Sequence, residues 1–80
     1  MKAVVAVRRK REVLDPQGKA IQRACGSLGH AGVLSVRQDK LFELEIDASG
    51  REPARRLVAE IAEKLLSNPV MEDWEIVALE

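Results

Sequence analysis

The sequence predicts an α+β fold with the order strand, helix, strand, strand, helix, strand. Two observations carry this prediction. Apolar residues recur at helical spacing from Pro16 to Leu28 and from Ala54 to Leu66, whereas Leu41 to Ile46 alternates apolar and charged residues as strands do. Eighty residues make a single domain, 1–80, and a domain this small buries only about 60% of its unfolded surface. We therefore expect oligomerisation or a partner to add stability.

The first strand and the first helix are separated by a short turn. Lys2 to Lys10 is rich in valine and predicts a strand that changes from apolar to basic along its length. Asp15 followed by Pro16 fits a helix N-cap and a first helical residue, and the spacing to Gly18 also fits a type I turn. The free N–H groups of such a helix start can accept an anion or a partner's carboxylate. The predicted helix, about Pro16 to Leu28, has one apolar face that we expect to be buried, formed by Ile21, Ala24, Cys25 and Leu28.

A pair of strands is predicted next. Val33 to Gln38 predicts the second strand, and Asp39-Lys40 is a plausible tight connection into the third, Leu41 to Ile46. In the third strand, apolar side chains alternate with Glu43 and Glu45. One face of this strand is therefore expected to be buried and the other solvated.

The second helix and the last strand complete the chain. The spacing of Ser49 and Glu52 fits a capping box, although Pro53 suits a first helical residue better than a fifth. The helix repeats its apolar residues for more than three turns, and Ser67-Asn68-Pro69 ends it because proline disfavours a helical residue before it. A final strand is expected at about Asp73 to Leu79.

This order is typical of ferredoxin-like βαββαβ domains, with a four-stranded antiparallel sheet and two helices on one face. The last strand carries apolar residues on both sides, since Trp74 and Ile76 alternate with Val77 and Leu79. Eighty residues cannot cover both faces of such a sheet. We therefore expect the chain to be oligomeric through a sheet edge or through the open face.

Composition excludes several function classes. The 13 Lys and Arg balance the 13 Asp and Glu, so net charge gives no pull toward nucleic acid or an anionic membrane. One Phe, one Trp and no Tyr leave few side chains for stacking on bases. The apolar run near the N-terminus is too short for a signal sequence or a membrane span. The single Cys25 agrees with a reducing, cytoplasmic location.

The inventory of catalytic groups is poor. Cys25 lies in an apolar helix stripe, where a buried, inert thiol is expected. His30 has no second metal ligand near it in sequence, and no phosphate-binding loop or nucleophile elbow is present. The basic run from Arg8 to Arg11 would give only salt-sensitive, unspecific binding to phosphates. A small regulatory domain that binds an amino acid or nucleotide between subunits remains open, because such domains use the loop where Asp15 and Gly18 lie.

The stretch from Val13 to Ile21, VLDPQGKAI, resembles the signature of PurS, the small-subunit family of phosphoribosylformylglycinamidine synthase. Val36-Arg37 followed by Lys40 resembles the hairpin of that family, and Lys64 to Trp74 resembles its C-terminal signature. The resemblance covers essentially the whole chain. Arg11-Glu12 and Asp39 depart from the family pattern.

The resemblance implies a small, non-catalytic subunit of an enzyme of purine biosynthesis. Such a subunit forms a dimer or tetramer with itself and joins a glutaminase subunit to a large synthetase subunit, supporting ammonia transfer between them. The complex uses ATP, Mg and glutamine, whereas we expect no cofactor, metal or nucleic acid to bind to this chain and no membrane to be involved. The residues expected to contact partners lie in the matching motifs and are Leu14, Asp15, Pro16, Gln17, Gly18, Arg37, Lys40, Asn68 and Pro69.

Overall fold

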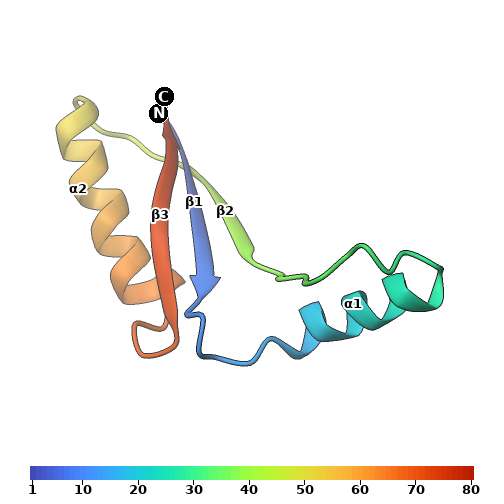
Figure 1. The fold of residues 1–80 in the computed structure, drawn as a ribbon. Helices are drawn as coiled ribbons and strands as arrows, with labels where there is room; N and C mark the ends of the chain where they lie inside the picture. Colours follow the sequence, from blue (N-terminus) through green and yellow to red (C-terminus); the bar gives the residue numbers. More distant parts are fainter.

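The computed structural model describes residues 1–80 and confirms an α+β fold. Its elements, in chain order, are β1 (Lys2–Arg9), α1 (Pro16–Ser27), β2 (Lys40–Glu45), α2 (Arg51–Ile61) with its π-helical continuation η1 (Ala62–Leu66), and β3 (Glu72–Leu79). Neighbouring strands are antiparallel and lie in the order β2-β1-β3. The first strand of the chain is therefore the centre of the sheet (Figure 1).

The core lies between one face of the sheet and α2. Ala3, Val5 and Val7 alternate along β1 and face this core. The helix contributes small side chains at every fourth position, which lets its backbone approach the sheet closely. These are Ala54, Val58 and Ala62. All six of these side chains are essentially inaccessible to solvent.

The outer strands pack against the core as their alternation predicts. Phe42 and Leu44 on β2 are partly buried against it, and so are Trp74 and Ile76 on β3. The expectation that Leu79 lies on the opposite side from Trp74 and Ile76 is wrong. The pairing of β1 with β3 shifts its register between Val4 and Val5, and Leu79 is buried in the core.

Both ends of the second helix follow from local chemistry. The capping box predicted from Ser49 and Glu52 is wrong: the N-cap is Gly50, which offers no side chain, and Pro53 occupies the third helical position. Proline is tolerated there because the first N–H groups of a helix have no intrahelical partner. At the other end, the break at Ser67 is confirmed, and its N–H and Oγ both donate to the carbonyl of Ala62, at 3.0 and 2.9 Å.

The sheet has three strands, so the prediction of a four-stranded sheet with a tight hairpin at Asp39-Lys40 is wrong. The segment predicted as the second strand, Val33 to Gln38, is not part of any ladder. It runs alongside α1, where Gln22 Nε2 donates to the carbonyl of Leu34 at 2.9 Å. The apolar pattern of the segment is real, but Leu34 is 84% exposed because nothing in the chain covers it.

Helix α1 does not lie on the sheet, which corrects the expectation that both helices cover one face. Together with the returning segment it forms a projection that we call the arm, residues 16–38 (Figure 1). The apolar face of α1 is therefore open: Ile21 is 43% and Leu28 is 77% exposed, and Cys25 is only half-buried. The radius of gyration is 16.1 Å, against about 12 Å expected for a compact chain of this length.

Neither helix has the length and the uninterrupted apolar composition needed to cross a bilayer.

Candidate functional site

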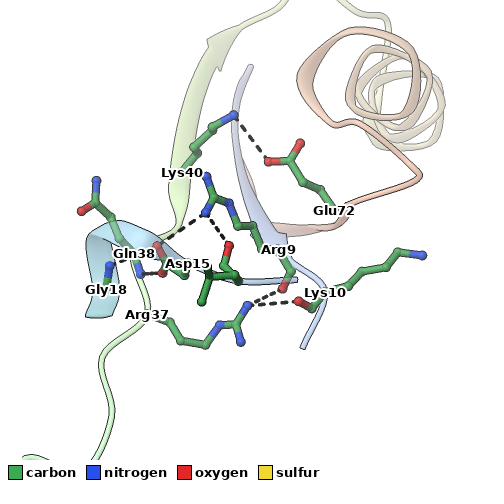
Figure 2. Close-up of polar contacts among 9 residues, drawn as sticks. Arg9, Lys10, Asp15, Gly18, Arg37, Gln38, Lys40 and Glu72 are labelled. Carbon is green, nitrogen blue, oxygen red and sulfur yellow. Dashed lines mark hydrogen bonds and ion pairs between the residues drawn. The ribbon is translucent and has the colours of Figure 1, made fainter. Parts of the chain in front are cut away.

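Asp15 is the centre of a polar cluster at the base of the arm (Figure 2). It caps α1, with Oδ1 accepting a hydrogen bond from the N–H of Gly18 at 3.1 Å. Oδ2 accepts another from the N–H of Gln38 at 2.7 Å. One carboxylate thus joins the start of the helix to the end of the returning segment. Only 9% of the residue is exposed.

Arg9, the last residue of β1, ties this cluster to the sheet. Its Nη1 lies 3.7 Å from Asp15 Oδ1 and donates to the carbonyl of Leu14 at 2.9 Å. The pKa of Asp15 is lowered, first by the N–H of Gln38, next by the N–H of Gly18, and also by the charges of Arg9 and Arg37, against the opposing effect of desolvation. The carboxylate is therefore ionised at neutral pH.

Arg37 closes the cluster from the other side. Its Nη2 donates to the carbonyls of Arg9 and Lys10, at 2.9 and 3.3 Å, and so fastens the returning segment to the end of β1. These bonds leave the remaining N–H groups of the guanidinium for other contacts.

Gly18 is required by a close approach of two backbones. A Cβ atom at this position would lie 2.2 Å from the carbonyl oxygen of Val36 and 2.7 Å from Asp15 Oδ2. The glycine is helical and does not adopt a positive φ, so its role is to let the returning segment touch α1. Its N–H is held by Asp15, which occupies the position that an external anion would take.

Lys40 and Asn68 meet at a second polar cluster, through Glu72. Lys40 Nζ lies 3.4 Å from Glu72 Oε2, and Glu72 Oε1 accepts from the N–H of Asn68 at 2.8 Å. The N–H of Asn68, followed by the charge of Lys40, lowers the pKa of Glu72. Asn68 Oδ1 also accepts from the N–H of Val70, which shapes the turn around Pro69.

The structure therefore places five of the nine predicted site residues in the two polar clusters and the other four outside them. Asp15, Gly18 and Arg37 meet at the base of the arm, and Lys40 meets Asn68 at the second cluster. The others lie on the surface nearby: Leu14 is 66% exposed, and Pro16, Gln17 and Pro69 are exposed as well.

Sequence reasoning missed Arg9, Gln38 and Glu72, which hold the two clusters together. Arg9 lies in the basic run from Arg8 to Arg11, for which the sequence predicted only unspecific binding to phosphates. Gln38 acts through its backbone N–H, which leaves no signal in a side-chain motif.

The two clusters contain no group of three His, Cys, Asp or Glu arranged to hold a metal ion. Their polar atoms bond mainly to one another and to the backbone, and this bonding fixes the arm to the sheet. The fold and the site thus define a small α+β module that presents a projecting arm.

A family model described as PurS, phosphoribosylformylglycinamidine (FGAM) synthase, matches residues 2–80. The chain is 53% identical to the phosphoribosylformylglycinamidine synthase subunit PurS of Mycobacterium leprae, over 94% of this chain and 91% of that one. It is similar to the structure of Thermus thermophilus PurS, with a TM-score of 0.88, 34% identity, and coverage of 99% of this chain and 93% of that one. A chain in the structure of PurLQS from Thermotoga maritima matches with a TM-score of 0.85, 32% identity and 99% coverage of both. This chain belongs to the PurS family.

Proposed function

We propose that this chain is the small, non-catalytic subunit of FGAM synthase in purine biosynthesis, and that it joins the glutaminase subunit to the ATP-dependent synthetase subunit. Membership of the PurS family and the likeness to a chain of the PurLQS structure support this proposal. The arm is the observation that carries it. Its apolar side chains have no cover within the chain, which favours a protein that works through contacts.

Self-association is part of the proposal. A second copy covers the apolar face of α1, where Ile21 and Leu28 are exposed, together with the exposed Leu34 of the returning segment. We place the main contact here rather than at the sheet edge, because the apolar side chains of the arm have no cover within the chain. The result is a dimer, or a tetramer if the open sheet face, with Leu41 and Val77 exposed, pairs as well.

The site residues have two roles in this proposal. Asp15, Pro16, Gly18 and Arg37 fix the position of the arm, as Asn68 and Lys40 fix the neighbouring turn. The remaining exposed residues make the contacts with partners, and these are Leu14, Gln17 and Pro69.

The chemistry belongs to the other subunits. ATP, Mg and glutamine bind to them, and this chain aligns the path along which ammonia passes from one to the other. We also propose a cytoplasmic location, on the ground that the single Cys25 suits a reducing compartment.

Co-purification tests the assembly role. The chain is expressed with the glutaminase and synthetase subunits of its own organism, and a tag on the synthetase is used for capture. We expect all three chains in one complex, and we expect the glutaminase to be lost from it when this chain is omitted. A glutaminase that stays bound to the synthetase without this chain would refute the bridging role.

A further inference from the structure

The arm has a charge pattern unlike the rest of the chain. Residues 16–38 contain Lys19, Arg23 and Arg37 and no Asp or Glu. Because the whole chain has 13 cationic and 13 acidic side chains, the remainder carries three more carboxylates than cations. An electropositive arm therefore projects from an electronegative body.

The cationic and apolar residues of α1 lie on different sides of the helix. At about 100° per residue, Lys19 and Arg23 lie one turn apart on one side, while Ile21 and Leu28 lie on nearly the opposite side. The returning segment occupies the side between them, through its contacts with Gly18 and Gln22. A second copy on the apolar side therefore leaves the cationic side free.

The cationic side faces a cavity of about 560 Å³ between α1, the loop after β1 and the returning segment. It is lined by three cations, Arg11, Lys19 and Arg37, by the apolar Val13, Leu14 and Val36, and by the carboxylates of Glu12 and Asp15. The carboxylate of Asp15, which also borders the cavity, is engaged by the N–H groups of Gly18 and Gln38.

Four cations line this cavity or lie next to it, and none of them forms an ion pair within the chain. The surrounding Arg8, Arg9, Lys10 and Lys40 all do. These four, Arg11, Lys19, Arg23 and Arg37, are the cationic face. A cation near a helix N-terminus is disfavoured by the helix dipole, and the acidic residue at this helix start is the N-cap Asp15, which is already engaged by two backbone N–H groups. Lys19 forms no ion pair with it.

We propose that the cationic face binds an acidic segment of one of the other two FGAM synthase subunits. This inference rests on the proposed function and names the chemistry of one of its contacts. A protein segment fits better than a small anion, because Arg23 extends the face along α1 beyond the walls of the cavity. Carboxylates of the partner segment form charge-assisted hydrogen bonds with these unpaired cations, and the attraction between the opposite charges speeds association of the two subunits.

The double variant Lys19→Glu/Arg23→Glu tests this inference in the co-expressed complex. Its matched control is Arg55→Glu/Arg56→Glu, which makes the same change of charge at exposed positions of α2. We expect the arm variant to bind the other subunits at least about tenfold more weakly at low salt, and to lose the salt dependence seen with the unmodified chain. The control variant should bind as the unmodified chain does, and both should keep its circular dichroism and its solution mass.

The outcomes separate the inference from the proposed function. If the unmodified chain does not bind the other subunits, the proposed function fails. If it binds and the arm variant binds equally well at every salt concentration, the inference alone fails. It also fails if inorganic phosphate or ADP raises the melting temperature of the unmodified chain but not of the arm variant while assembly is unchanged, because the face is then a site for a small anion.

Discussion

The substitution Gly18→Ala tests whether the returning segment is packed on α1 as closely as the structure describes. The added Cβ would lie 2.2 Å from the carbonyl oxygen of Val36, which is backbone and cannot rotate away. Accommodation requires the returning segment to move off the helix, which would also lengthen the bond between Asp15 Oδ2 and the N–H of Gln38.

Two opposing effects set the change in the free energy of unfolding caused by Gly18→Ala. Alanine is favoured over glycine in a helix by up to about 1 kcal/mol. Overpacking of a well-packed contact costs about 1–3 kcal/mol, and a separation this short belongs at the upper end of that range. We therefore expect Gly18→Ala to destabilise the fold by about 1–2 kcal/mol. For a domain of 60–100 residues, each 1 kcal/mol lowers the melting temperature by roughly 4–8 °C.

Gly26→Ala is the matched control, since it lies in the same helix and its added Cβ would meet no atom within 4 Å. It should be neutral or stabilising by up to about 1 kcal/mol. Urea denaturation and thermal unfolding at one fixed protein concentration compare the two, because self-association makes stability depend on concentration. If Gly18→Ala is as stable as Gly26→Ala, the close approach between α1 and the returning segment is wrong.

Three further predictions concern the base of the arm, the core and the apolar face. Because the pKa of Asp15 is lowered, its carboxylate adds stability that is present above the ordinary value of 3.8 and is lost as the pH falls below that value toward the folded-state pKa. Asp15→Asn should therefore flatten the fall of the urea midpoint below about pH 4, and an unchanged profile would contradict this role. Val58→Ala should cost about 2 kcal/mol in urea denaturation, while the control Leu65→Ala, at a position 79% exposed, should stay within about 0.5 kcal/mol; equal losses would refute the assigned core. Ile21→Asp/Leu28→Asp should reduce the oligomer to a monomer in analytical ultracentrifugation, and an unchanged mass would exclude the apolar face as the interface.

The elements that depend on local sequence were predicted well. The strand that begins at Lys2, the cap at Asp15 and the break at Ser67 are specified by neighbouring residues, and the structure has all three. The wrong prediction of a capping box at the start of α2 also has a local cause. The spacing of a capping box appears by chance where a glycine serves as the N-cap instead.

The prediction of a four-stranded sheet was wrong for a different reason. The apolar face of α1 and the apolar pattern from Val33 to Gln38 show that these segments need cover, but periodicity does not say which chain supplies it. The prediction of a compact fold assumed that the same chain covers them. In the structure, Leu28 and Leu34 stay exposed instead.

The candidate site was predictable only in part. Asp15 and Gly18 belong to one continuous motif, so their role at a helix start could be anticipated from spacing. The contacts of Arg9 and Arg37 with backbone carbonyls, and that of Asp15 with the N–H of Gln38, join segments far apart in sequence. No local pattern contains such contacts, and they appear only when the returning segment is placed beside α1.

Activity of the assembled enzyme tests the central claim most directly. The glutaminase and synthetase subunits are assayed with and without this chain, using either glutamine or ammonia as the nitrogen source, with ATP and Mg present throughout. We expect omission of the chain to abolish the glutamine-dependent reaction and to leave the ammonia-dependent reaction nearly unchanged, because the chain joins two active sites and supplies neither. Equal glutamine-dependent rates with and without the chain would contradict the account.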